Sequence, residues 1–198
     1  SIEAVKIFDL ELPNIETAQR WVSSRIPRSN FCDRFTFKLC DSGGEILHLR
    51  LQPNEVISWL QSAVLATRRL ALPREECYSL GNLAIVLGET GDTWSAIRHL
   101  ERVLSLSTLN LNDRKAVGLT LMNLGVRWHD LGAIDEFQFQ SLFLYSYAIF
   151  VLDSLESDVD TDNKELFRNK AHATMNIGNA LSDLRLYSDA IYHLDLSR

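Results

Sequence analysis

Prolines and cysteines are scarce in this sequence. Its four prolines all lie at or before Pro73, so residues 74–198 contain none. Because proline interrupts α-helices more strongly than any other residue, this long stretch can be helical throughout. The three cysteines, Cys32, Cys40 and Cys77, are odd in number and match no metal or redox spacing. We therefore expect reduced, mostly buried thiols and a cytoplasmic protein.

Positive charge is also in short supply. The 198 residues include 20 Lys and Arg against 26 Asp and Glu, a formal net charge of −6. Binding to nucleic acids or to anionic membranes depends on clustered basic residues, so we expect neither partner. The most apolar stretch, Ser141–Leu152, is shorter than the roughly 20 residues of a membrane helix. No basic segment followed by an apolar one opens the chain, so no secretion signal is expected.

Motifs for catalysis are missing as well. The sequence has no Walker loop, GxGxxG, HExxH, CxxC or GxSxG pattern. Its histidines are scattered, and the acidic segment Glu156–Asn163 lacks the glycine and the closing glutamate of a calcium-binding loop. We predict no catalytic residues, no cofactor and no metal. An enzyme built on a helical scaffold remains a remote alternative.

Three segments resemble one another. They read Leu80-Gly-Asn-Leu83-Ala84, Leu121-Met-Asn-Leu124-Gly125 and Thr174-Met-Asn-Ile177-Gly178. Large residues three positions apart mark one face of a helix, and the small residue marks a close approach by a neighbouring helix. Gly91 and Gly132 then fall where the helix should stop. Ala96 and Leu100 begin the apolar stripe of a second, antiparallel helix.

A fourth, weaker copy precedes these three. Ala84 and Gly125 are 41 positions apart, and a step of about 40 positions back from Ala84 reaches Gly44. Pro53 is expected to start the second helix of this copy. The copy is degenerate, because Asp41–Gly44 is a poor helix interior.

The repeated residues resemble the tetratricopeptide repeat (TPR), in the lengthened form of kinesin light chain and of the sensor arrays of bacterial signalling ATPases. The resemblance implies an all-α fold, a right-handed α-α superhelix of antiparallel helix pairs. We place the array at 31–198, with repeats at about 31–72, 73–110, 111–157 and 165–198, the last one incomplete. The second helix of the third repeat is predicted at Ile134–Ser157. Residues 1–30 are predicted to be a capping region or the tail of an upstream domain, with a helix at Ile15–Ile26 after Pro13.

The resemblance also implies a binding site. In lengthened TPR arrays an asparagine ladder lines the concave groove and holds an extended peptide, and the matching residues here are Asn82, Asn123 and Asn176. A carboxamide both donates and accepts hydrogen bonds, as a peptide backbone does. In the degenerate first repeat Ser42 stands at the matching place. Helical spacing adds further residues to this face: Ile85, Met122, Val126, His129, Met175 and Asn179.

Two alternatives apply to this site: the asparagines could simply bond the adjacent turn, and the apolar residues could pack between repeats. We predict a non-catalytic protein–protein interaction module that binds a peptide or protein segment in the groove. A distinct hypothesis is a sensor or autoinhibitory arm of a larger signal-transduction ATPase or regulator. Self-association through uncapped repeat ends is also expected.

Overall fold

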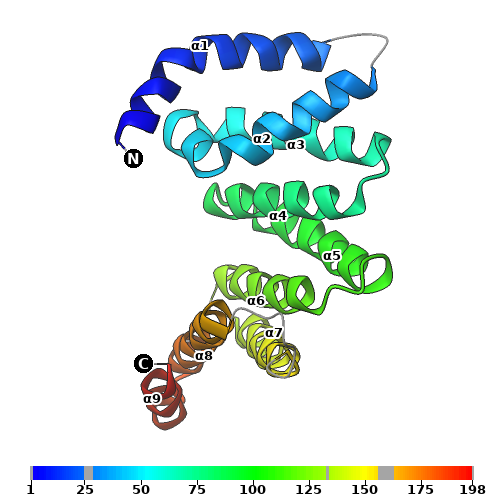
Figure 1. The fold of residues 1–198 in the computed structure, drawn as a ribbon. Helices are drawn as coiled ribbons and strands as arrows, with labels where there is room; N and C mark the ends of the chain where they lie inside the picture. The colour runs from blue at the N-terminus through cyan, green and yellow to red at the C-terminus, as the bar shows by residue number, and fades with distance from the viewer. Residues whose placement is uncertain (1, 25–28, 133, 156–162, 198) are drawn as a thin grey trace. The chain divides into compact units, whose positions relative to one another are not determined.

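The computed structural model describes residues 2–24, 29–132, 134–155 and 163–197. Within these ranges the chain is helical and contains no β-strand, which confirms the all-α prediction. In chain order the helices are α1 (Ile2–Ser24), α2 (Asn30–Arg50), α3 (Pro53–Arg69), α4 (Pro73–Glu89), α5 (Thr93–Leu109), α6 (Arg114–Asp130), α7 (Asp135–Asp153), α8 (Asn163–Asp183) and α9 (Tyr187–Leu196) (Figure 1).

The helices group into two compact units. The first unit is Ser1–Val86 and the second is Leu87–Arg198, so the boundary falls within α4. The first unit holds α1 to α3 and most of α4, and the second holds the end of α4 and α5 to α9. The predicted limits of the cap and of the four repeats stay predictions.

Glycines end two helices where the sequence pattern predicted a stop. Gly91 follows α4 with a φ of +89°, and Gly132 follows α6 with a φ of +104°. Residues that carry a side chain rarely adopt these left-handed φ angles, so glycine is favoured at both positions. The N–H of Gly91 donates to the carbonyl of Gly88, and the N–H of Gly132 donates to that of His129. Each turn thus gives a hydrogen-bond donor to a backbone carbonyl that would have no partner at the end of its helix.

Proline and aspartate start four of the helices. Pro53 and Pro73 are the first residues of α3 and α4, where the missing N–H would have no partner within the helix. Asp92 and Asp113 precede α5 and α6, and each accepts the backbone N–H three residues later, at 3.2 and 3.0 Å. These caps satisfy donors of the first helical turn. The predicted start at Pro53 is confirmed.

Helix α1 is longer than the sequence pattern predicted. The pattern placed its start after Pro13, whereas α1 begins at Ile2 and carries Pro13 in its interior. An interior proline costs one backbone hydrogen bond, but the residues before it are held by a contact with α2. Arg50 donates to the two carboxylate oxygens of Asp9 at 2.5 and 3.2 Å. The predicted start was wrong, and this contact between residues 41 positions apart gives no signal in local propensity.

Helix α2 also continues through Asp41–Gly44, the segment predicted to be a poor helix interior. The buried side chain of Leu47 lies over Gly43, where an added Cβ would come within 2.6 Å of it. The glycine therefore makes room for packing in the first unit, although it has low helix propensity. The low helix propensity expected of Asp41–Gly44 therefore does not interrupt α2.

An ion pair joins α2 to α3 in the first unit. Arg69 Nε donates to Asp33 Oδ2 at 2.9 Å and Arg69 Nη2 donates to Asp33 Oδ1 at 2.6 Å. The side chain of Asp33 is 5% exposed and that of Arg69 is 38% exposed. This two-point geometry is the strong form of a charge-assisted hydrogen bond. It fixes the end of α3 against the start of α2.

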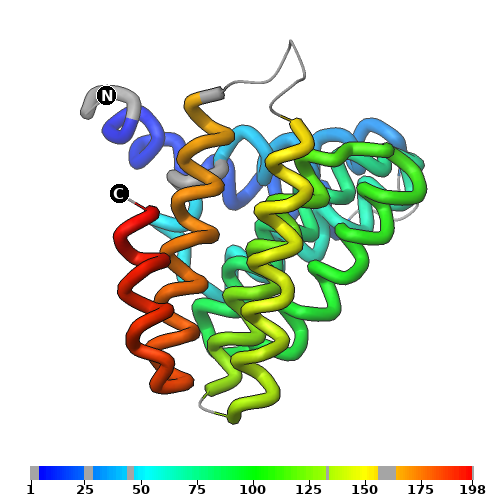
Figure 2. Tube along the Cα trace, turned by 90° about the horizontal axis from the view of Figure 1, so that it is seen from below, coloured from blue at the N-terminus to red at the C-terminus, as the bar shows by residue number. Residues whose placement is uncertain are grey.

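The second unit contains two helical hairpins, α6/α7 and α8/α9, and Figure 2 shows α7, α8 and α9 side by side. A Cβ added at Gly125 of α6 would lie 2.6 Å from the Tyr145 ring of α7. A Cβ added at Gly178 of α8 would lie 2.7 Å from Leu194 of α9. The predicted close approaches at both glycines are confirmed, and each lies within a hairpin.

The connection between α7 and α8 carries the acidic segment of the sequence. Helix α7 ends at Asp153, earlier than the predicted end at Ser157. Leu152 and Leu155 form a buried cluster with Leu166 of α8. The end of α7 therefore lies where its apolar side chains pack against α8. The acidic residues 156–162 lie outside the described residues.

Candidate functional site

The three predicted asparagines lie on the first helices of their hairpins. Asn82 is on α4 in the first unit, whereas Asn123 on α6 and Asn176 on α8 belong to the second. All three side chains are half-buried. None of them forms a hydrogen bond with another described residue. The alternative in which they bond the adjacent turn is therefore not what the structure shows, and their carboxamides are open to a ligand.

Helices α6 and α8 run in the same direction in the second unit, and two ion pairs join them. Lys115 Nζ lies 2.5 Å from Glu165 Oε2 near the start of both helices. His129 Nε2 lies 2.8 Å from Asp183 Oδ2 near their ends. The histidine contact is not aligned as a hydrogen bond, since Nε2 has no bonded partner, and it is an ion pair when the imidazole is protonated.

These two contacts set the register of α6 against α8. His129 follows Gly125 by four positions and Asp183 follows Gly178 by five, whereas Lys115 precedes Gly125 by ten and Glu165 precedes Gly178 by thirteen. The two repeats are therefore in register to within about one helical turn. Asn123 and Asn176 each stand two positions before these glycines, and so lie within about one turn of each other along the two helices. Repetition along one face is what a ligand with a regular backbone requires.

Three of the six other predicted site residues are exposed, and three are half-buried. Met175 and Ile85 are each 41% exposed, and Asn179 is exposed. Met122, Val126 and His129 are half-buried. In the second unit the exposed part of this face combines methionine side chains with carboxamides. Methionine adapts its shape to apolar anchors of a partner, and the carboxamides supply polar contacts.

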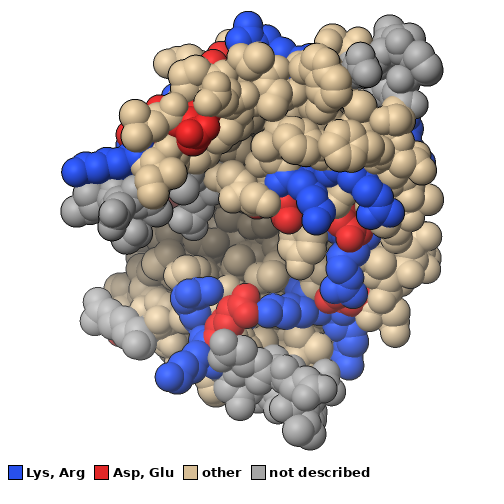
Figure 3. Space-filling view, turned by 45° about the horizontal axis from the view of Figure 1, so that its top comes forward, with Lys and Arg blue, Asp and Glu red and all other residues tan. Residues whose placement is uncertain are grey.

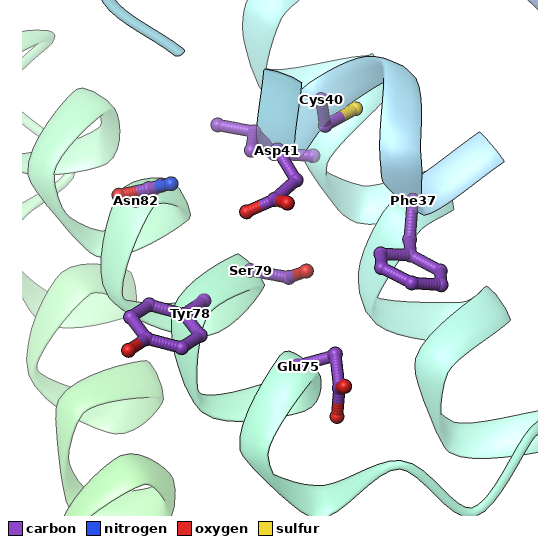
Figure 4. Close-up of a pocket in the computed structure, with 8 residues that line it drawn as sticks. Phe37, Cys40, Asp41, Glu75, Tyr78, Ser79 and Asn82 are labelled. Carbon is purple, nitrogen blue, oxygen red and sulfur yellow. The ribbon is translucent and has the colours of Figure 1, made fainter. Parts of the chain in front are cut away.

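A hollow in the first unit lies between α2, α3 and α4. It has a volume of about 10 Å³, room for about one water molecule, and is lined by Phe37, Cys40, Asp41, Leu60, Glu75, Tyr78, Ser79 and Asn82. Figure 4 shows Asp41, Ser79 and Glu75 between the rings of Tyr78 and Phe37. None of the lining residues is basic. Asn82 is thus part of an acidic, partly aromatic hollow.

The sequence analysis missed Asp41 as a lining residue. Ser42, the residue favoured there, lines a different hollow between α1 and α2. The sequence did contain a signal for Asp41. It precedes Asn82 by 41 positions, the same interval that separates Asn82 from Asn123. Since successive helix residues point about 100° apart, counting with a period of 40 selects the wrong face.

The described residues include no group of three or more His, Cys, Asp or Glu placed to hold a metal ion. None of the described helices is long and apolar enough to cross a membrane. On the face drawn in Figure 3, Lys and Arg side chains lie beside Asp or Glu, and uncharged residues cover most of the remaining surface.

Cys40 lines the hollow as an uncharged thiol. Burial, with a further contribution from the Asp41 carboxylate, raises the pKa of Cys40 to about 12. The folded state disfavours the thiolate, so the contribution of Cys40 to the free energy of unfolding is fully present below the pKa of the unfolded thiol, roughly 8.5. This contribution is lost as the pH rises toward 12.

The raised pKa predicts slow alkylation of Cys40. At about pH 9 we expect iodoacetamide to modify Cys40 at least tenfold more slowly in the folded chain than in urea, because the thiolate is the reactive form. Peptide mass mapping over time measures both rates. Equal rates in the two conditions would show that the thiol is neither buried nor held neutral.

Comparison with known proteins identifies the fold. No family model matches the chain, and no curated protein matches it. Among solved structures, BtubC (BKLC) from P. vanneervenii is 13% identical, with a TM-score of 0.66 over 99% of this chain and 78% of that one. A putative kinesin light chain from Podosopora anserina, with nearly identical TPR-like repeats, is 12% identical, with a TM-score of 0.67 over 99% and 90%.

A second structure of the Podosopora anserina protein gives a TM-score of 0.68 at 12% identity, with the same coverage. At this level of identity the matches establish the fold. The chain has the TPR-like helical-repeat fold that the sequence pattern predicted, similar to that of kinesin light chain-like proteins.

Proposed function

From its TPR-like fold we propose that the chain is a non-catalytic protein–protein interaction module, and that it binds extended peptide segments on the exposed face of α4 in the first unit and on the exposed faces of α6 and α8 in the second. Proteins with this fold generally mediate contacts between proteins. The observation that carries the proposal is the set of carboxamides of Asn82, Asn123 and Asn176, which repeat with the helices and have no partner among the described residues.

The physical basis of binding is the match between a carboxamide and a peptide backbone. Each asparagine offers one acceptor and two donors, and a backbone presents a C=O and an N–H at each residue. Asn123 and Asn176 occupy matching positions of neighbouring helices that are in register to within about one turn, a spacing that one strand of peptide can cover. Met122 and Met175 precede these asparagines and supply adaptable apolar contacts. Contacts to the peptide backbone allow binding of peptides with different sequences, and the apolar contacts add selectivity for particular side chains.

The test uses peptides selected from a random library on the full chain. We expect Asn123→Ala together with Asn176→Ala to weaken their binding at least tenfold, since each lost hydrogen bond is worth about 1 kcal/mol. Asn82→Ala tests the first unit separately. The matched control is Asn14→Ala with Asn54→Ala and Asn110→Ala, three exposed residues away from these faces. Unchanged affinity in the site variants, with helicity and melting preserved, would refute the asparagine contacts.

Four further predictions from the sequence are compatible with this proposal. A sensor or autoinhibitory role within a larger signalling protein is tested by the complete open reading frame. Cytoplasmic location, absence of nucleic-acid and membrane partners, and self-association stay predictions. Exposed apolar side chains on α9, Ile191 and Leu196, support self-association.

A further inference from the structure

We propose that an exposed aromatic stripe on α7 is the surface through which two copies of this chain associate. The stripe consists of Phe139, Phe143, Tyr147 and Phe150. It lies on a different helix from the asparagines of the proposed peptide site, and it does not depend on peptide binding. It also differs from the self-association through repeat ends that the sequence predicts.

Helix α7 is apolar on two opposite sides. On one side Tyr145, Ala148 and Leu152 are buried in the second unit, where Tyr145 lies against Gly125 of α6. The stripe residues follow one another at intervals of four, four and three positions, so they share the opposite side of the helix. They are 45–69% exposed. Residues 137–152 contain no charged side chain. A helix that is apolar all round is normally covered on all sides.

The rings of the stripe form a continuous ridge. The ring centroids of Phe143 and Tyr147 are 6.2 Å apart, and those of Tyr147 and Phe150 are 6.3 Å apart. The ridge runs along about three turns of α7. Ridges of this kind pack into the grooves between the side chains of a second helix. An identical helix supplies both the ridge and the groove, so the stripe can pair with itself across a two-fold axis.

The area of the stripe is large enough for a specific pair. A fully packed aromatic side chain buries about 150–250 Å², so these four partly exposed rings offer about 470 Å² in each copy. Two copies would cover about 900 Å² with the rings alone, and a specific interface needs roughly 1,000 Å² in total. The neighbouring exposed residues Gln140 and Ser146 supply the remainder. Because the stripe is uncharged, two chains that each carry a net charge of −6 can meet there without opposing carboxylates.

The charges at the two ends of the stripe favour a second copy in antiparallel orientation. Asp135 and Glu136 begin α7, and both are exposed and without an ion pair among the described residues. At the other end Lys170 Nζ of α8 lies 2.5 Å from Asp153 Oδ1, and the exposed Arg168 stands two positions before Lys170. Antiparallel pairing brings the acidic end of one copy next to the basic side chains of the other. Parallel pairing would instead place the two acidic ends together.

Sedimentation velocity of the full chain tests the proposal over a range of concentrations from about 1 to about 100 μM. The mass of one chain is 22.5 kDa, and we expect the measured mass to rise toward twice this value as the concentration increases. A mass that stays at that of one chain over the whole range would overturn the proposal, and the stripe would then be a surface for a different protein.

Variants locate the contact. Phe143→Ser with Phe150→Ser is expected to weaken association by about tenfold or more, since central aromatic side chains dominate the binding energy of interfaces. The matched control, Ile191→Ser with Leu196→Ser, removes two similarly exposed apolar side chains from α9 and should leave association unchanged. Circular dichroism checks that both variants keep the helicity and melting temperature of the native chain. Association that is lost in the α9 variant and retained in the α7 variant would place the contact at the repeat end and overturn the proposal.

Discussion

Replacing Gly125 by valine is expected to destabilise the second unit by about 3 kcal/mol. The Cβ of any other residue would lie 2.6 Å from the ring of Tyr145, and that ring is 2% exposed. A fully packed ring has no free space into which it can move, so α6 and α7 must separate. The measurement is the melting temperature, with an expected loss of roughly 6–12 °C.

The matched control is Gly81→Ala in α4. An added Cβ at Gly81 has no heavy atom within 4 Å, and alanine is favoured over glycine in a helix by about 0.5–1 kcal/mol. This variant should therefore be slightly more stable than the native chain. If both substitutions have the same sign, helix propensity decides the outcome and the close approach of α6 to α7 does not exist.

Removing the guanidinium from the Asp33–Arg69 pair is expected to cost about 2 kcal/mol in the first unit. In Arg69→Met the buried carboxylate of Asp33 loses two hydrogen bonds of 2.9 and 2.6 Å. The partial exposure of Arg69 places the expected cost below that of a fully buried pair. Urea unfolding of the full chain measures the loss.

A double-variant cycle separates the pair from its surroundings. Asp33→Leu combined with Arg69→Met should be more stable than Arg69→Met alone, because no carboxylate then remains buried without its partner. Additive losses in the cycle would mean that the two side chains do not interact, and would contradict the geometry of this contact.

The repeat pattern predicted the hairpins correctly because it records packing within each pair of helices. A small residue at Gly125 or Gly178 is needed only where another helix passes close by, and Gly91 and Gly132 adopt left-handed angles. The need for a small residue and the need for a left-handed φ angle each restrict one position to glycine or another small residue. Both can therefore be recognised in a single sequence. They are the reason that the all-α repeat fold could be predicted.

Tertiary contacts explain what the sequence did not reveal. Helix α1 begins before Pro13, and Asp9 in this part pairs with Arg50 of α2. Helix α2 continues through Gly43, where Leu47 of the next turn packs over the glycine. The contact of Asp9 with Arg50 has no local signal. The same holds for the hollow in the first unit, whose residues come from three helices.

The candidate site was predictable in its repeated part only. Asn123 and Asn176 follow from the repeat, and the contacts between α6 and α8 hold the two helices in register to within about one turn. Asp41 was missed because the assumed period was one residue too short, which shifts a side chain to another face of its helix. Its pairing with Glu75 in one hollow depends on how α2 packs against α4 within the first unit.

The most direct test of the account is to map a library-selected peptide on the full chain by amide chemical-shift perturbation. We predict that the largest changes fall on α4, α6 and α8, around Asn82, Asn123 and Asn176. The exposed aromatic residues of α7, such as Phe143 and Phe150, should be unaffected. Changes confined to α7 or α9, with none at the three asparagines, would contradict binding on the first helices of the repeats.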